Sequence, residues 1–218
     1  MTSDVVVPVV LDLQLPAGIL GPTPIAADVR CFLVPHDSGV LIVDAGPPGS
    51  APALARGLEA LGAVWSDVTD VVLTHSHFDH TGGLPALLAT ASAAAVWAGA
   101  HDAPDIAAQA GHPVTPLADG ARLRGMHVVA TPGHTPGHIS MLDQSGGLLL
   151  VGDVAGVLGG TLGRAPAAFT ADPELAERSL HRLCRLGADR ALFSHGPEIA
   201  SGVSQLQALA DTARPSRP

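Results

Sequence analysis

The 218-residue chain contains no lysine, no asparagine and no tyrosine, so arginine supplies every fixed side-chain cation. A reaction that depends on a catalytic lysine or tyrosine is therefore excluded. Lys and Arg together number 11 and Asp and Glu 20, which gives a formal net charge of −9. This balance disfavours a nucleic-acid partner, because nothing would offset the repulsion from its phosphates. We therefore expect a small-molecule substrate.

Cysteine and long apolar runs are also scarce. The two cysteines, Cys31 and Cys184, lie far apart without metal-type spacing, so we expect reduced thiols rather than a disulfide framework. The longest weakly polar stretch, 84–100, is too short and too rich in alanine to span a membrane. The first residues lack the basic region typical of a signal peptide. These features predict a cytoplasmic protein without a membrane partner, either a monomer or a homodimer.

Apolar runs of strand length alternate with helical segments along the chain. Short turns join several of these runs, which favours a mixed β-sheet. We predict one domain over residues 1–213, followed by a frayed tail at 214–218. Two stretches rich in proline and glycine, Pro16–Pro24 and Gly156–Ala168, are predicted to be loops. The predicted strands are Val5–Leu15, Cys31–Pro35, Val40–Asp44, Val68–Thr74, Ala95–Ala98, Met126–Thr131, Ile139–Asp143, Leu148–Gly152 and Arg190–Ser194. The predicted helices are Ala51–Leu61, a short helix in the stretch 84–100 ahead of the strand Ala95–Ala98, Pro173–Leu186 and Val203–Ala213.

The strongest chemical signal is the segment Thr74–His80, which reads THSHFDH. His75 and His77 are two residues apart, so on extended backbone their imidazoles project to the same side, and Asp79 continues that alternation. His80 breaks the alternation, which requires a turn, and the Thr-Gly-Gly that follows permits one. Four ligand-type residues this close together can surround more than one ion. Imidazole and carboxylate together suit zinc, iron or manganese.

Three further residues of ligand type each follow an apolar run. His134 comes after Met126–Thr131, Asp153 follows Leu148–Gly152, and His195 follows Arg190–Ser194. One such placement carries little information, because His and Asp are common in loops. The repeated placement of ligand-type residues after strands is informative, because the cluster at 75–80 also follows a strand. We expect all seven side chains to gather at one edge of the sheet.

Taken in this order, the motifs resemble those of the metallo-β-lactamase fold superfamily of metallohydrolases. The resemblance covers nearly the whole chain and rests on Asp44-Ala45-Gly46, HSHFDH at 75–80, TPGHTPGH at 131–138, Gly152-Asp153 and His195-Gly196. It implies an α/β (α+β) fold, a four-layer αββα sandwich of two mixed β-sheets with helices on the outer faces. It also implies a binuclear metal site along the edge of the sheets.

The resemblance further implies a role for each ligand-type residue. The first metal would be bound by His75, His77 and His134. The second metal would be bound by Asp79, His80 and His195. Asp153 would bridge the two ions, and Asp44 would orient a ligand imidazole through its other nitrogen. The implied cofactors are two divalent ions, most often zinc in such proteins, with iron or manganese as alternatives.

Such a site implies hydrolysis by a glyoxalase II-like, metal-dependent enzyme. A metal-bound water has a pKa of about 7, so hydroxide exists at neutral pH. A hydroxide that bridges both ions would attack an ester, thioester or lactone carbonyl, and Asp79 would act as the catalytic residue that orients it. Because lysine and tyrosine are absent, the metals or backbone N–H groups would stabilise the oxyanion.

Two alternatives to this hydrolase stay open. Persulfide dioxygenases share these motifs but hold a single iron through residues equivalent to His75, His134 and Asp153. A non-catalytic metal-binding protein is disfavoured, because such members usually lose ligands that are intact here.

Two residues near the motifs have open roles. Arg164 is the only cation in its loop, so we expect it either to contact an anionic substrate group or to remain a solvated side chain. His138 is a spare imidazole four residues after His134, and it is either the true ligand or a group that tunes the site.

Overall fold

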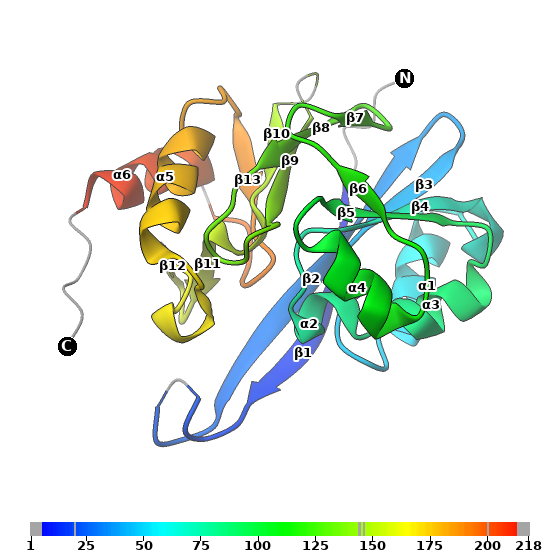
Figure 1. Cartoon of the computed structure of the whole chain (residues 1–218), viewed down its shortest axis with the longest axis horizontal. Coiled ribbons are helices and arrows are strands. Elements are labelled where there is room, and N and C mark those ends of the chain that lie inside the picture. The colour runs from blue at the N-terminus through cyan, green and yellow to red at the C-terminus, as the bar shows by residue number, and fades with distance from the viewer. Residues whose placement is uncertain (1–5, 20, 144, 146, 200, 213–218) are drawn as a thin grey trace.

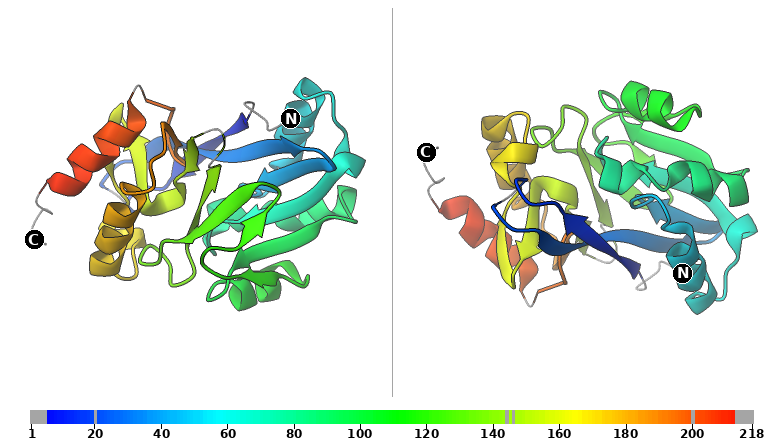
Figure 2. Two further views of the ribbon diagram at one scale, coloured as in Figure 1. Left: turned by 90° about the horizontal axis from the view of Figure 1, so that it is seen from above. Right: turned by 90° about the horizontal axis from the view of Figure 1, so that it is seen from below.

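The computed structural model describes residues 6–19, 21–143, 145, 147–199 and 201–212. Two β-sheets pack face to face, and helices cover the outer face of each (Figure 1). The views from above and below show α1, α3 and α4 on one side of the sheets and α5 and α6 on the other (Figure 2). This arrangement confirms the predicted four-layer sandwich. The predicted frayed tail, 214–218, lies outside the described residues.

The first sheet has six strands in the order β1-β2-β3-β4-β5-β6. The pairs β1–β2 and β2–β3 are antiparallel, whereas β3–β4, β4–β5 and β5–β6 are parallel, so the sheet is mixed as predicted. The strand bounds are β1 Val7–Leu15, β2 Ile25–His36, β3 Gly39–Val43, β4 Val68–Leu73, β5 Ala95–Gly99 and β6 Thr115–Leu117. β2 begins six residues before the predicted strand and pairs with β1 along the whole length of β1.

The second sheet has five strands in the order β13-β10-β9-β8-β7. Only β10 and β13 are parallel among its described pairs. The strand bounds are β7 Arg122–Leu123, β8 Met126–Ala130, β9 Ile139–Asp143, β10 Leu148–Leu150 and β13 Arg190–Leu192.

A separate hairpin corrects the loop prediction for Gly156–Ala168. Strands β11 (Ala155–Leu158) and β12 (Thr161–Arg164) pair antiparallel inside that stretch. Gly159 and Gly160 join them with φ of 58° and 80°. Positive φ at both central residues is what a tight two-residue hairpin turn requires, so these glycines promote pairing rather than a loop.

Six α-helices and three short 3₁₀ segments connect the described strands. The α-helices are α1 Ala51–Ala60, α2 Phe78–Thr81, α3 Leu84–Thr90, α4 Ala103–Ala110, α5 Pro173–Leu183 and α6 Gly202–Asp211, and the 3₁₀ segments are η1 Trp65–Asp67, η2 Gly152–Val154 and η3 Ala167–Phe169. α5 begins where predicted, because Asp172 caps it by accepting the backbone N–H groups of Glu174 and Leu175. None of the helices in the described part of the chain has the length and hydrophobicity that a membrane span requires.

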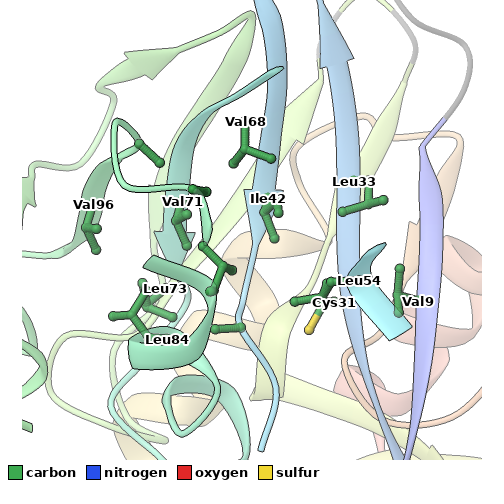
Figure 3. Packing of buried hydrophobic residues seen from close by; sticks show 14 of the residues in the cluster. Val9, Cys31, Leu33, Ile42, Leu54, Val68, Val71, Leu73, Leu84 and Val96 are labelled. Atoms are coloured by element: carbon green, nitrogen blue, oxygen red, sulfur yellow. The ribbon is translucent and has the colours of Figure 1, made fainter. Parts of the chain in front are cut away.

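The alternation of side chains along the strands divides the buried residues among three layers. Leu33 and Ile42 face the helices α1, α3 and α4, in the cluster shown in Figure 3. Their neighbours Phe32 and Leu41 face the second sheet instead. A third cluster joins the outer face of the second sheet to α5 and α6. Both faces of these strands are therefore apolar, as expected for sheets that are covered on both sides.

Candidate metal centre

The predicted site residues follow strands that end at one edge of the sandwich. Asp44 follows β3 and His75 follows β4, and these two strands are parallel. In the second sheet, His134, Asp153 and His195 follow β8, β10 and β13, which also run in one direction. The edge therefore collects side chains from both sheets, as the strand-end pattern predicts.

The short helix α2 supplies the remaining members of the cluster. His77 is its N-cap, and Asp79 and His80 lie within it. Gly83, just after this helix, packs against the backbone of Ala45, where a Cβ atom would overlap the carbonyl oxygen. Glycine therefore allows the end of the helix to lie close to the turn after β3. The alternation breaks at His80 because the chain is already helical from Phe78 onward.

Three imidazoles converge at the first position. The Nδ1 atom of His77 lies 3.1 Å from Nε2 of His75 and 2.9 Å from Nε2 of His134. A neutral imidazole nitrogen carries either a proton or a lone pair, so three nitrogens facing one point cannot satisfy one another by hydrogen bonds. A cation at that point would satisfy all three.

Asp153 connects this trio to the second group. Its Oδ2 atom lies close to the Nε2 atoms of four histidines: 3.1 Å from His195, 3.5 Å from His80, 3.5 Å from His134 and 3.9 Å from His75. Asp79 completes the second group, because its Oδ2 lies 3.4 Å from Nε2 of His195 and 3.6 Å from Nε2 of His80. All seven predicted ligands therefore lie in one cluster.

The cluster fits divalent cations. Among its buried polar atoms, Nε2 of His80 and Oδ1 of Asp153 have no hydrogen-bond partner among the described residues. Buried polar atoms are rarely left unpaired in folded proteins, so such atoms in one place indicate a missing partner. Imidazole and carboxylate are ligands that zinc and iron accept.

Three of the imidazoles are held from behind through Nδ1. Asp44 Oδ2 lies 2.9 Å from Nδ1 of His80, and the backbone carbonyl of Asp28 lies 2.7 Å from Nδ1 of His195. Thr74 Oγ1, which donates to Asp44, lies 3.0 Å from Nδ1 of His75. Each acceptor requires the proton on Nδ1, so the lone pair of Nε2 faces the site.

Asp44 is itself held in a conformation that few residues adopt. Its φ is 64°, in the left-handed region, and its side chain is fully buried. Its Oδ1 accepts the backbone N–H of Thr74 at 2.7 Å. The carboxylate thus fixes both the turn after β4 and the ring of His80.

His138 supports the site without facing it. Its Nε2 accepts the backbone N–H of Asp153 at 2.9 Å, and its Nδ1 lies 2.8 Å from Oγ1 of Thr131. Burial lowers the pKa of His138 to about 4. Because both ring nitrogens have partners in the protein, this geometry makes the spare imidazole a support for Asp153.

Asp102 is a supporting residue that the sequence motifs do not reveal. It is buried at the N-cap of α4, directly after β5. Its Oδ2 accepts the N–H of Ser76 at 2.9 Å and the hydroxyl of Thr135 at 2.6 Å, and its Oδ1 accepts the N–H of Gly137 at 2.6 Å. It therefore ties the loop of His75 and His77 to the loop of His134. Its place after a predicted strand, Ala95–Ala98, is the signal that could have revealed it.

The charges in the cluster suit cation binding. Burial and the nearby His80 lower the pKa of His75 well below its ordinary value, and burial lowers that of His134 to about 3. Burial alone would also lower the pKa of His80, but the carboxylates of Asp153 and Asp44 raise it well above the usual range. Burial opposes ionisation of Asp153, yet the neighbouring imidazoles hold its pKa well below its ordinary value. The carboxylate is therefore ionised, and a bound cation would displace the proton from His80.

Arg164 lines a cavity beside the cluster, but its charge is already engaged. Its Nε donates to Oε2 of Glu177 at 2.6 Å, and a terminal nitrogen donates to Oε1 at 2.7 Å. The guanidinium also donates to the hydroxyl and carbonyl of Thr212, both at 3.0 Å. Hydrogen bonds from the guanidinium to Glu177 raise the pKa of Arg164. The predicted contact with an anionic substrate group stays a prediction.

Comparison with known proteins places this geometry in context. A model of the metallo-beta-lactamase superfamily matches residues 26–195. The chain is 31% identical over 188 residues to the hydroxyacylglutathione hydrolase of Ectopseudomonas mendocina (strain ymp), with 78% of this chain and 69% of that protein covered. More broadly, it spans about two thirds of the length of the curated relatives that it matches (66%, 69% and 61%).

Solved structures agree with the fold. The metallo-beta-lactamase family protein TTHA1429 from Thermus thermophilus gives a TM-score of 0.66 at 26% identity, with 93% of this chain and 78% of that chain covered. TTHA1623, solved in a di-iron-bound form, gives a TM-score of 0.64 at 30% identity, with 89% of this chain and 96% of that chain covered.

Proposed function

Because the chain belongs to the metallo-beta-lactamase superfamily, we propose that it is a binuclear metallohydrolase that cleaves an ester, a thioester or a lactone. The observation that carries this proposal is the position of Asp153. A single carboxylate oxygen lies 3.1–3.9 Å from the Nε2 atoms of four histidines that belong to two ligand groups. A residue shared in this way suits a bridge between two cations.

The seven ligand residues divide between the two ions. The first ion would be held by His75, His77 and His134, and the second by Asp79, His80 and His195. Asp153 would contribute to both. When bound, the ions would supply Lewis-acid chemistry, lowering the pKa of a coordinated water to about 7 and polarising the substrate carbonyl. Zinc is the metal we expect, and the di-iron-bound relative makes iron the main alternative.

The protein's own groups prepare and orient this chemistry. Asp44 and the carbonyl of Asp28 hold His80 and His195 with their Nε2 lone pairs toward the site. His138 fixes the backbone of Asp153, so the shared carboxylate stays aimed at both groups. Asp79 faces the cavity and is partly exposed, so it is placed to accept a hydrogen bond from the attacking water and to orient it.

The test combines metal content with a hydrolysis panel on protein purified without added metal. Elemental analysis should give about two ions per chain, and chelator-sensitive hydrolysis should appear on small esters, thioesters or lactones. A glutathione thioester belongs in the panel because of the named activity of the relative from E. mendocina. Asp153→Asn should lower kcat/KM by about 100-fold or more. His112→Ala is the matched control, because that imidazole contacts the carbonyl of Pro113 and is not among the described cavity-lining or candidate ligand residues.

Two results would contradict the proposal. Metal-loaded protein that hydrolyses nothing in the panel would exclude this activity. A single iron per chain without hydrolysis would favour oxygen chemistry at His75, His134 and Asp153, to be checked by oxygen uptake with a persulfide.

A further inference from the structure

A cavity of about 370 Å³ opens directly beside the metal ligands, a volume typical of small-molecule sites. His77, His134, Asp79, Asp153 and His195 line its inner end. Its other walls come from segments far apart in sequence: the β1–β2 hairpin, the β11–β12 hairpin, and the region around η3. Figure 1 shows the β1–β2 hairpin extending past the first sheet toward β12.

The strand pattern of β1 explains why one of these walls is apolar. Odd-numbered residues of β1 face inward, and Val9 and Leu11 belong to the buried core. Leu13 and Leu15 continue the same face beyond the core and reach the cavity instead. Ala27 pairs directly with Leu13 and adds its methyl group to the same wall.

Two apolar side chains at the cavity are unusually exposed. Phe78 is 67% exposed and Leu158 40% exposed, and both line the cavity. Phe78 stands between the ligand residues His77 and Asp79, and Leu158 ends β11. Exposed apolar side chains that cluster around a concave site indicate a surface that another apolar group covers.

Away from the metal ligands, no cation in the described lining is available to bind an anion in the cavity. Arg164 is the only arginine among those lining residues, and the chain contains no lysine. Its guanidinium makes a two-pronged ion pair with Glu177, which already neutralises it. A carboxylate at the far end of a substrate chain would therefore lose its hydration and gain no partner.

We propose that the substrate carries an uncharged, apolar chain of medium length, which lies in this cavity while its carbonyl reaches the metal ligands. This inference rests on the proposed hydrolase function, since it names the substrate class of the same site. The chain would contact Leu13, Leu15, Leu158 and Phe169. Its burial would also cover Phe78 at the cavity mouth.

The primary test compares acyl thioesters of increasing length on the metal-loaded protein. From acetyl to octanoyl, kcat/KM should rise about two- to fourfold per methylene, in line with about 0.8 kcal/mol for each buried CH₂. Hexanoyl and adipoyl thioesters have the same number of carbons, but the adipoyl chain ends in a carboxylate. The adipoyl compound should be at least about tenfold slower. A second series uses acetyl esters of alcohols of increasing length. It tests whether the cavity holds the chain of the leaving group instead of the acyl chain.

Variants locate the effect in the cavity. Leu158→Asp and Leu15→Asp should flatten the dependence on chain length and reduce the preference for hexanoyl over adipoyl. Val10→Asp is the matched control, because Val10 is exposed on the opposite face of β1. It should leave both the chain-length series and the hexanoyl preference unchanged.

A binding measurement separates this inference from the hydrolase proposal. Octanamide is neutral and resists hydrolysis, and we expect calorimetry to show that it binds the wild-type protein whereas acetamide does not. Hydrolysis that is equally fast for acetyl, octanoyl and adipoyl substrates, with no octanamide binding, would overturn the apolar-chain inference and leave the hydrolase intact. Octanamide binding without hydrolysis of any panel compound would instead overturn the hydrolase.

Discussion

At the residue scale, the candidate metal centre is built on buried polar groups that hold the candidate ligands in place. Asp44 supports His80, His138 supports the backbone of Asp153, and Asp102 joins two ligand loops. Groups of this kind fix ligand orientation, and their loss typically costs about 10–100-fold in metal affinity or activity. Removing one of these groups should therefore lower the metal affinity more than it lowers the stability of the fold.

Asp102→Asn tests this at the residue that motifs did not reveal. An amide keeps one acceptor oxygen but turns an NH₂ group toward donors, so one of the two loops should loosen. We expect the zinc affinity, measured by competition with a chromophoric chelator, to fall by about 10–100-fold. Asp105→Asn, in the first turn of the same helix, is exposed and should leave the affinity unchanged. An unchanged zinc affinity in Asp102→Asn would show that the two ligand loops keep their positions without hydrogen bonds to Asp102.

The candidate ligands could be grouped from the sequence because each one belongs to a short motif or follows a strand. His75, His77, Asp79 and His80 are almost consecutive, so their grouping needs no long-range information. Asp102 differs, because its hydrogen bonds reach residues 26 to 35 positions away. Locally, only its position after the predicted strand Ala95–Ala98 marks it, and an ordinary helix N-cap can have the same position.

At the element scale, α5 positions the loop that carries His134. The backbone N–H of Asp172 donates to the carbonyl of Gly133, and that of Ala171 donates to the carbonyl of His134. Ser179, farther along the helix, donates its hydroxyl to the carbonyl of Pro132 at 2.7 Å. The loop is therefore clamped against the helix over several consecutive residues.

Gly133→Ala tests this clamp. Gly133 has φ of 132°, and a Cβ atom there would overlap the backbone of Ala176 in α5. Gly111→Ala is the matched control, because Gly111 also has positive φ but open space around it. The control should lose about 1–2 kcal/mol of stability from backbone strain alone. Gly133→Ala should lose at least twice as much in urea unfolding and should also weaken zinc binding. Equal losses in the two variants would contradict the clamp.

The strand pattern gave most elements within a few residues, whereas the connections were harder to predict. The β11–β12 hairpin was predicted as a loop because its short strands are rich in glycine. The first half of β2 was not predicted because Ile25–Arg30 mixes apolar and charged residues. This part of the strand is mostly only partly buried, so it lacks a clear apolar pattern. Both errors lie in the two hairpins that form the cavity walls, where side chains face a ligand space rather than the core.

At the scale of the whole molecule, a buried carboxylate away from the candidate metal centre, paired with a partly exposed arginine, couples stability to pH. Asp70 accepts hydrogen bonds from Trp97 Nε1 at 2.9 Å, Arg124 Nε at 2.6 Å and Thr69 Oγ1 at 2.6 Å. Burial alone would raise the pKa of Asp70, but these hydrogen bonds hold it below its ordinary value. A depressed carboxyl pKa stabilises the fold at pH values above about 4, and this stabilisation is lost as the pH falls through the folded-state pKa.

Asp70→Asn should therefore destabilise the protein by about 1–3 kcal/mol at pH 7. The difference from wild type should shrink steadily below pH 4, because the wild-type carboxyl then becomes neutral as well. Urea unfolding at a series of pH values measures this difference. Asp12→Asn, at an exposed position of β1, is the control. A difference that stays constant down to pH 2 would contradict the coupling.

Metal binding should also stabilise the whole molecule. A ligand that binds only the folded state adds about 4 kcal/mol at a concentration 1,000-fold above its Kd. For a chain of this size that corresponds to roughly 10 °C in Tm. Zinc should therefore raise the Tm and a chelator should reverse the increase. Magnesium, which prefers oxygen ligands, is the matched control and should change the Tm little. Equal effects of both ions would indicate nonspecific binding.

The position of the ligands at the boundary of the two sheets has a kinetic consequence. His75, His77, Asp79 and His80 belong to the first sheet and its helices, whereas His134, Asp153 and His195 belong to the second. A cation there joins segments up to 120 residues apart, and contacts of such separation form late in folding. Interactions absent from the transition state slow unfolding and leave the folding rate nearly unchanged. The bound metals would thus act as a latch on the finished fold, prolonging the lifetime of the native protein without helping it to form.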